Sequence, residues 1–306
     1  MTEPTDARVA VYIDFDNIVI SRYDQLSRRG QFHKDQVRGF DAKANQGTDV
    51  ARRLEESTVN LGAILDFASS FGTIAVSRAY ADWSVPVNAS YRNQLFERAV
   101  DLVQLFPAVA SMKNGADIRL AVDVVEDLFR LEDLTHVVIV AGDSDYIALA
   151  QRCKQLGRYV VGIGVAGATS KNLAAACNEF ADYDALPGVV PPRRSAPAKA
   201  DTTEPSGDVP PQRPAKAQKP KPMSAKDAAA DLLVRALELG QAKNDEDWQS
   251  SSAIKNQMLR MDPTFQERAL GHSSFTDFVT SLPDLVEFDP DHPLRRIRLK
   301  PAAKKR

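Results

Sequence analysis

The chain has 306 residues, of which 43% are hydrophobic and 26% charged, and its formal net charge is −2. This balance is ordinary for globular protein, and the length favours two folded units. No run approaches the roughly 20 apolar residues that cross a bilayer, and the N-terminus has no signal region, so we expect a cytoplasmic protein without membrane contact. The small net charge neither favours nor excludes a nucleic-acid partner, because binding depends on where basic residues lie.

Two cysteines and four histidines occur, and neither residue type forms a recognisable site. Cys153 and Cys177 lack a CxxC pair and the Cys/His spacing of zinc sites, so we expect two reduced thiols without a disulfide. The histidines are dispersed, without the spacing of a catalytic triad or a metal site. Chemistry is therefore expected from other side chains.

Residues 8–187 show apolar, β-rich runs that alternate with helical patterns. The predicted strands are residues 9–14, 73–80, 102–106, 136–141 and 159–164. The predicted helices are residues 50–70, 88–100, 117–130, 145–156 and 170–176. The alternation predicts a Rossmann-like, three-layer α/β fold, in which helices cover both faces of a parallel sheet. Residues 21–48 interrupt it with a polar stretch, which we expect to be an inserted, mobile loop.

Ten of the 18 prolines fall in residues 187–222, a stretch without aromatic residues. Such a segment buries too little apolar surface to offset its ordering entropy, so residues 188–224 are predicted to be a disordered linker. Residues 225–300 form a second predicted domain, and residues 301–306 a basic tail. Three helical patterns followed by an alternating hairpin around residues 290–293 predict a small, winged-helix-like α+β module.

Aspartates stand where ligands bind in α/β folds, just beyond the carboxyl ends of strands. Asp14 and Asp16 end the first strand, and Asp143 and Asp145 follow the fourth. Asp117 opens a helix that would run back from the same edge. If the two strands are neighbours, these carboxylates crowd together and need a divalent cation to offset their repulsion. Oxygen-only ligands favour Mg²⁺ or Mn²⁺ over zinc, and such a site suits phosphodiester hydrolysis.

Each aspartate alone is more typical of a helix N-cap, so the prediction depends on the joint pattern. Asp123, Glu126 and Asp127, further along the same helix, are expected on a solvated face, with contact between Asp123 and the metal as the alternative. Five aromatic residues are expected to pack in or around the core, with base stacking as the alternative: Tyr12, Phe15, Tyr80, Trp83 and Tyr146. Arg78 and Arg92 are interpreted as surface arginines, with a phosphate track as the alternative.

VYIDFDNI, the KxxxD of Lys113 to Asp117, AGDSDY, and SKNL before CNEFADY resemble the NYN domain, a PIN-like nuclease group. The resemblance covers residues 8–187 and implies Mg²⁺- or Mn²⁺-dependent cleavage of RNA. It implies that four aspartates bind the metal and catalyse the reaction: Asp14, Asp117, Asp143 and Asp145. It also implies that five residues beside them bind the substrate: Asn17, Lys113, Ser144, Ser170 and Lys171. Of these, Lys113 would neutralise the scissile phosphate, and Ser170 with Lys171 would receive a phosphate at a helix N-terminus.

LLVRALELG, Trp248, SSAIKNQMLRMDPTF and GHSSFTDFVTSLPDLVEF are similar to the LOTUS, or OST-HTH, domain. This resemblance spans residues 225–300 and implies RNA binding or docking of an RNA helicase. LOTUS domains often accompany NYN domains, so the two resemblances support each other. The basic run of Arg295, Arg296, Arg298 and Lys300 is a candidate phosphate contact.

Two alternatives to a ribonuclease stay open. A strand that ends in Asp14 and Asp16 is similar to the nucleophile motif of haloacid-dehalogenase-like phosphatases, although Ile18 departs from that motif. The other alternative is a non-catalytic adaptor, in which both domains bind RNA without turnover. The sequence makes no prediction of the oligomeric state.

Overall fold

The computed structural model describes residues 7–42, 44–106, 115–165, 171–190, 224–244, 246–262 and 264–301. Residues 191–223 and 302–306, which hold most of the expected linker and tail, lie outside this description, as do Lys113 and Ser170. Among the described residues, no helix combines the length and the apolar character needed to cross a membrane.

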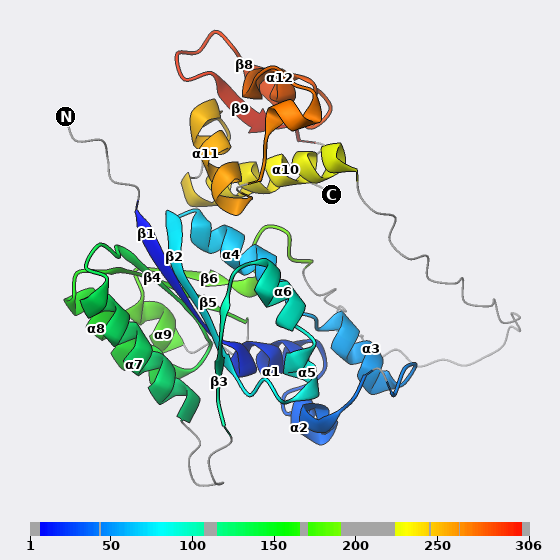
Figure 1. Cartoon of the computed structure of the whole chain (residues 1–306), viewed down its shortest axis with the longest axis vertical. Coiled ribbons are helices and arrows are strands. Elements are labelled where there is room, and N and C mark those ends of the chain that lie inside the picture. The colour runs from blue at the N-terminus through cyan, green and yellow to red at the C-terminus, as the bar shows by residue number, and fades with distance from the viewer. Residues whose placement is uncertain are drawn as a thin grey trace, which may run out of the picture.

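A parallel sheet of six strands forms the centre of the first domain, in the order β3-β2-β1-β4-β5-β6 (Figure 1). The strands are β1 (Arg8–Asp14), β2 (Thr73–Ala81), β3 (Asp101–Gln104), β4 (His136–Val140), β5 (Tyr159–Gly164) and β6 (Glu179–Asp182). Five coincide with predicted strands, whereas β6 was not predicted, because EFAD is too short and too polar to show a strand pattern. The order reverses between β1 and β4, which lie side by side. In open parallel sheets such a switch point is where ligands bind.

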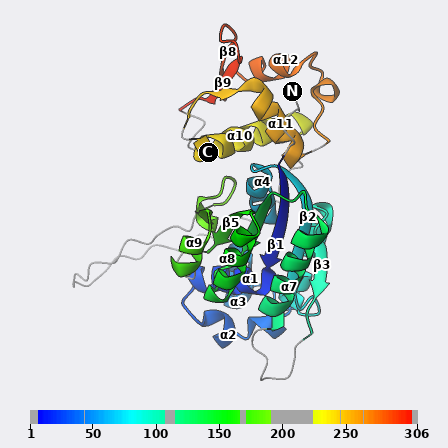
Figure 2. The ribbon, with the colours of Figure 1, turned by 90° about the vertical axis from the view of Figure 1, so that its left-hand side faces the viewer.

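Helices cover both faces of this sheet (Figures 1 and 2). Alternate residues of β1 point to opposite faces, with Val11 in one apolar core and Tyr12 in the other. The first core is closed by α1 (Phe15–Leu26), α4 (Leu61–Ser69), α5 (Pro86–Ala89) and α6 (Arg92–Glu97). The second is closed by α7 (Gly115–Arg130), α8 (Ile147–Gln155) and α9 (Lys171–Ala176). The expectation of a three-layer α/β fold is confirmed.

The prediction of an inserted, mobile loop over residues 21–48 was wrong. The segment contains the second half of α1, then α2 (Gln31–Lys34) and the 3-10 helix η1 (Val37–Gly39). Tyr23, Phe32 and Val37 are buried in the first core, and the Tyr23 hydroxyl donates to Asp35 at 2.6 Å. These apolar residues are too widely spaced among polar ones to show a helical period, so the sequence pattern missed the packing.

Two long predicted helices are each divided in the structure. Residues 50–70 hold α3 (Asp49–Glu56) and α4, and residues 88–100 hold parts of α5 and α6. The Thr48 side chain caps α3 by accepting from Ala51 N, and Asn60 caps α4 by accepting from Ala63 N. The second cap starts α4 on a new axis. That axis lays α4 against β1 and β2.

The second domain has the predicted winged-helix-like composition. Its elements are α10 (Ala225–Asn244), β7 (Gln249–Ser250), α11 (Ser251–Met261), η4 (Glu267–Leu270), α12 (Phe275–Thr280), β8 (Val286–Asp289) and β9 (Arg296–Leu299). The strands form an antiparallel sheet in the order β7-β9-β8. Ser274 caps α12 by accepting from Asp277 N, as its place before the third helical pattern indicates.

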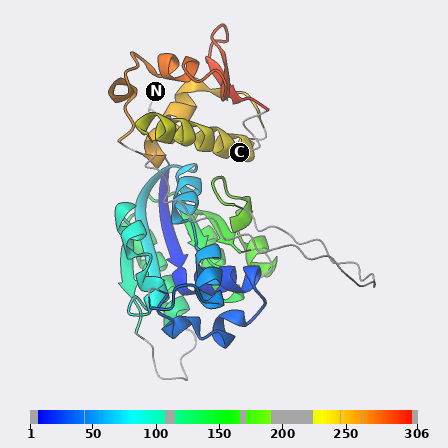
Figure 3. The same ribbon diagram turned by 90° about the vertical axis from the view of Figure 1, so that its right-hand side faces the viewer.

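This second domain is docked on the end of the sheet where the strands begin, with α11 packed on α4 (Figures 1 and 3). Every residue of α4 is buried. Gln257 of α11 donates to the Ser69 hydroxyl at 3.1 Å, and Arg260 donates to the Ser69 carbonyl at 2.9 Å. Lys243 of α10 donates to the Ser70 carbonyl at 2.8 Å. The last turn of α4 is therefore a docking surface for polar groups as well as apolar ones.

Asp66 is the charged centre of this interface. Its side chain is 3% exposed and accepts hydrogen bonds from Arg98, at 3.1 Å, and from Arg235 of α10. Burial raises the pKa of Asp66, even though both arginines act in the opposite direction. One carboxylate thus joins α6 and α10 through α4.

Replacing Asp66 by alanine is expected to lower the free energy of unfolding by about 2 kcal/mol, because two partly buried arginines lose their acceptor. Urea unfolding of the full chain measures this loss. Glu56→Ala is the control, since its ion pair with Arg52 is exposed and is expected to contribute less than about 0.5 kcal/mol. Equal losses in the two variants would contradict a docking role for Asp66.

Candidate active site

The carboxyl ends of β1 and β4 meet at the switch point and are tied together by Asn17. Asp14, the last residue of β1, caps α1 by accepting from Asn17 N at 3.2 Å. The Asn17 side-chain oxygen accepts from Gly142 N, in the loop after β4, at 3.1 Å. Asp143 follows and caps η2 (Ser144–Tyr146) by accepting from Asp145 N at 3.3 Å. The neighbouring strands therefore bring both acidic segments to one edge.

The hydroxyl of Tyr146 joins two carboxylates at this edge. It lies 2.9 Å from Asp14 Oδ2 and 2.8 Å from Asp117 Oδ1, and its ring is buried. A hydroxyl carries one proton and donates to one acceptor at a time. The second contact is therefore favourable only when a further proton, or another positive charge, lies between the oxygens. The sequence singled out Tyr146 only as an aromatic residue, so this hydroxyl was missed.

Burial and like charges raise the pKa of both carboxyls. Burial raises the pKa of Asp14 to about 7, with smaller contributions from Asp117 and Asp16, although the hydrogen bonds from Tyr146 and Asn17 lower it. Burial also raises the pKa of Asp117, and the charges of Asp143 and Asp145 add to the rise. No basic side chain among the described residues contributes to either shift. Asp14 and Asp117 thus form an acidic pair to which no described basic side chain donates a hydrogen bond.

The remaining predicted site residues that the structure describes differ in exposure. Asp143 is half-buried, whereas Ser144 and Asp145 are exposed, and Lys171 is exposed at the start of α9. Within the described residues, no three carboxylates, histidines or cysteines lie close enough to hold a metal together. The structure therefore joins Asp14 and Asp117 directly and leaves Asp143 and Asp145 at electrostatic range.

The strand-end pattern suggested that the side chains of Asp14 and Asp16 meet at the carboxyl edge of the sheet. The structure does not bear this out for Asp16. Its side chain accepts a hydrogen bond from Asn88 at 2.7 Å. Asn88 also donates to the carbonyl of Asp82, whose carboxylate accepts from Ser84 and from Gln104, the latter at 3.0 Å. These contacts fix the loop after β2. Asp82 comes two residues after the predicted strand 73–80 and directly after β2, and that position is the signal that could have found it.

Asp123 and Asp127 are buried, which corrects the expectation that they lie on a solvated face. The Tyr80 hydroxyl donates to Asp123 at 3.0 Å, and the Tyr12 hydroxyl donates to Asp127 at 2.9 Å. Arg78 also pairs with Asp127, at 2.6 Å, and is not a free surface arginine. Glu126, in contrast, is exposed as expected. The polar ties hold α7 against β1 and β2, so that Asp117 in its first turn reaches Tyr146.

The five aromatic residues near the strands are all buried, as the packing interpretation expected. Arg92 donates to the carbonyl of Trp83 and also has a structural partner. Cys153 and Cys177 are buried free thiols, and burial raises their pKa values to about 12 and about 11.

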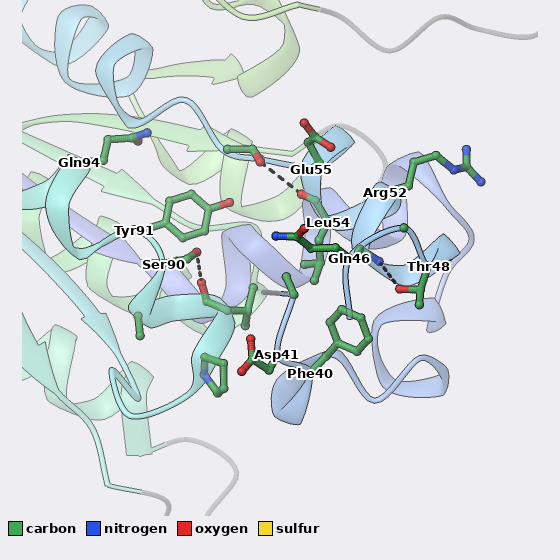
Figure 4. A pocket seen from close by; sticks show the side chains of 17 residues that line it. Phe40, Asp41, Gln46, Thr48, Arg52, Leu54, Glu55, Ser90, Tyr91 and Gln94 are labelled. Carbon is green, nitrogen blue, oxygen red and sulfur yellow. Dashed lines mark hydrogen bonds between the residues drawn. The ribbon is translucent and has the colours of Figure 1, made fainter. Parts of the chain in front are cut away.

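A separate pocket of about 790 Å³ lies between the segment before α3 and the helices α5 and α6 (Figure 4). Phe40, Arg52, Glu55 and Tyr91 are among its lining residues, and none of the four candidate metal-binding aspartates is. The pocket is therefore distinct from the acidic edge.

A six-stranded parallel sheet with aspartates at its switch point is consistent with the PIN-like nucleases. The chain belongs to the NYN domain family, because the model of that family matches residues 8–184, more than half of the chain. The OST-HTH/LOTUS domain model matches residues 223–293. A PIN-like nuclease domain followed by a LOTUS domain indicates a role in RNA processing. This membership lends no support to the phosphatase alternative.

Other comparisons add little. A search of curated proteins gives no match. Among solved structures, a protein of unknown function from Vibrio parahaemolyticus RIMD 2210633 is similar at 18% identity with a TM-score of 0.42. That similarity covers 60% of this chain and 96% of the other.

Asp14→Asn is expected to stabilise the chain at pH 8 in EDTA, by up to about 4 kcal/mol, because each pKa unit corresponds to about 1.4 kcal/mol. The pKa of Asp14 rises from 3.8 to about 7 on folding, so the folded state binds more protons and loses stability as the pH rises through that window. Asparagine is not subject to this loss, and at pH 4 the two chains should be nearly equal. Urea unfolding at both pH values tests this, with the exposed Asp101→Asn as the control. A variant less stable than the wild type at pH 8 would refute the explanation.

Proposed function

We propose that the chain is a Mg²⁺- or Mn²⁺-dependent endoribonuclease that cleaves RNA at the carboxyl edge of its sheet. The observation that carries the proposal is the meeting of Asp14 and Asp117 at one Tyr146 hydroxyl, with Asp143 and Asp145 close enough to raise the pKa of Asp117. Two acidic side chains, from β1 and α7, thus meet directly where α/β folds bind ligands, and two more, from the loop after β4, lie at electrostatic range of Asp117.

The donor set fits a divalent metal. Asp14 is 4% exposed and Asp117 is half-buried, and neither pKa is lowered by a basic side chain among the described residues. A cation at this edge would offset both the burial and the repulsion that raise the two pKa values. The available ligands are carboxylate oxygens, which match Mg²⁺ or Mn²⁺ better than zinc.

In the proposed reaction, Asp14, Asp117, Asp143 and Asp145 hold the metal. The bound metal would activate water and stabilise the charge that develops on the phosphodiester. The Tyr146 hydroxyl sets the separation of Asp14 and Asp117, and Asn17 holds the β1 and β4 loops in register. The exposed side of the edge carries Ser144, with Lys171 at the start of α9, and we propose both as substrate contacts. The same role is proposed for Lys113 and Ser170.

Asp143→Asn is expected to lower the rate of RNA cleavage by a factor of about 100 or more, with folding and RNA affinity nearly unchanged. One charge at the metal is removed with little change in volume. The assay follows labelled single-stranded and structured RNA in Mg²⁺, Mn²⁺ or EDTA. Asp101→Asn, an exposed change at the opposite end of β3, is the control and should cleave like the wild type. Equal cleavage by the Asp143 variant would overturn the assigned site.

An RNA-binding adaptor is the second candidate, and one observation favours it. Within the described residues, no three potential ligands are close enough to hold a metal together. Binding of RNA without cleavage on every substrate and with either metal would establish the adaptor and exclude the nuclease. Cleavage that requires both metal and Asp143 would do the reverse.

The LOTUS domain is proposed to bind the RNA, and an RNA helicase is a further proposed partner. Of the four basic residues around β9, two form ion pairs with other described residues and two do not. Arg296 pairs with Asp289, and Arg298 pairs with Glu287. Both guanidinium groups lie over the Trp248 ring, 5.3 and 4.5 Å from its centroid. These two arginines therefore have structural partners.

Arg295 and Lys300 flank this cluster and form no ion pair with another described residue. Replacing both by alanine is expected to weaken RNA binding and to reduce the slope of log K against log salt by about 1.4, since each phosphate contact in single strands contributes about 0.7. Binding measured over a salt series tests this prediction, with Lys226→Ala in α10 as the control. An unchanged slope would show that this surface does not meet the RNA backbone.

A further inference from the structure

Helix α7 is apolar on two opposite faces, and only one of them is covered. Leu120, Val124 and Leu128 face the sheet and are buried in its second core. On the other face, Ile118, Val122 and Phe129 are 63%, 56% and 61% exposed. A surface helix ordinarily carries polar residues on its outer face, so an apolar outer face indicates a partner.

The exposed residues form a narrow stripe. Ile118, Val122, Val125 and Phe129, here called the α7 stripe, are spaced by four, three and four residues. At about 100° per residue they fall within roughly 60° of the helix circumference. This is the spacing by which two helices pack along a common seam. Val125 is half-buried and lies at the middle of the stripe, against the second core.

Two charged residues lie along one flank of the stripe. Arg119 and Glu126 are seven residues apart and so share one side of the helix. Their side chains are 60% and 57% exposed, and each pairs only within α7, with Asp123 and Arg130 respectively, among the ion pairs of the described residues. Exposed pairs at this spacing contribute little, so both charges are available to a partner across the seam.

We propose that the α7 stripe is a self-association surface, on which a second copy of this chain packs its own α7 in antiparallel orientation. A two-fold axis near the middle of the stripe places Ile118 opposite Phe129 of the second copy and Val122 opposite Val125. The same axis puts Arg119 of one copy within about 3 Å, along the helix axis, of Glu126 in the other. Both charge pairs form at once, because the axis repeats each contact.

The charge pattern selects this arrangement over a parallel one. In a parallel pair of helices, residues on one flank of the seam in the first helix face residues on the opposite flank in the second helix. Arg119 and Glu126 would then face the flank that carries Ala121, and neither would gain an opposite charge. Helix α7 lies on the side of the molecule turned to the viewer in Figure 2, and the docked LOTUS domain lies above it. A second copy can therefore approach it without displacing that domain.

Sedimentation velocity of the full chain over a wide concentration range tests the proposal. The wild type should be a dimer in exchange with monomer, and Val122→Arg should weaken the dimer by about 100-fold or more, because a charge is buried at the seam. Phe96→Arg is the matched control, since Phe96 is 83% exposed on α6, outside the stripe, and its replacement should leave the dimer intact. Circular dichroism and the unfolding midpoint of each variant separate loss of association from loss of folding.

Charge reversal gives a second, independent measurement. Arg119→Glu and Glu126→Arg should each weaken the dimer by about 10-fold, since each places like charges across the seam. The double variant should recover most of the wild-type affinity, because opposite charges face each other again. A wild type that stays monomeric at every concentration would overturn the proposal. So would a dimer that Val122→Arg leaves intact, or a double variant as weak as the single ones.

Discussion

One hydroxyl meets two carboxylates at the switch point of the sheet, and the strands and the helix that carry these groups are tied together around that contact. Tyr146 meets Asp14 and Asp117 within hydrogen-bond distance, although the two carboxylates repel each other. A buried arrangement of this kind reduces stability, and it persists because the surrounding packing fixes it. The pairs of Tyr12 with Asp127 and Tyr80 with Asp123 supply that packing, because they fasten α7 to β1 and β2. The two carboxylates therefore stay close together, because the surrounding structure prevents them from moving apart.

Much of this architecture could be predicted from the sequence, because its strands are buried on both sides. Runs such as VVIV before AGDSDY identify strands and place their aspartates at one edge, and the pairing of β1 with β4 then brings those edges together. What could not be predicted depends on orientation. Asp16 comes two residues after the end of β1 and Asp143 three residues after the end of β4, yet the Asp16 side chain turns to Asn88. The position of a carboxylate along the chain predicts which edge of the sheet it lies at, but the orientation of its side chain depends on its hydrogen-bond partners.

Asp123 and Asp127 illustrate the same limit in a helix. Periodicity counts apolar residues, so an aspartate on the inner face of α7 is assigned to solvent. The buried tyrosine hydroxyls that receive these carboxylates come from β1 and β2, more than 40 residues away in the chain. The prediction for residues 21–48 was wrong for a related reason. Isolated buried residues such as Phe32 and Val37 hold that segment against the core without producing a periodic apolar pattern.

The position of the LOTUS domain sets a geometric problem for the proposed function. The domain is fixed to α4 at the end of the sheet where β1 begins, whereas Asp14 stands at the other end of that strand. Seven residues of strand separate these ends by about 23 Å. Moreover, Arg235, Lys243 and Arg260 donate hydrogen bonds to α4 and to the residue that follows it. RNA held by this domain must therefore pass along the sheet to reach the acidic edge of the same chain.

An antiparallel pair built on α7 changes this geometry. The helix runs from the acidic edge to the opposite end of the sheet, over 16 residues or about 24 Å. Reversing a second copy about the middle of α7 therefore sets its acidic edge beside the end of the first copy that carries the LOTUS domain. RNA bound by one copy would then lie next to the carboxylates of the other. This arrangement accounts for two features at once. It covers the apolar α7 stripe, and it lets a LOTUS domain that is distant from its own acidic edge deliver RNA to the acidic edge of the other copy.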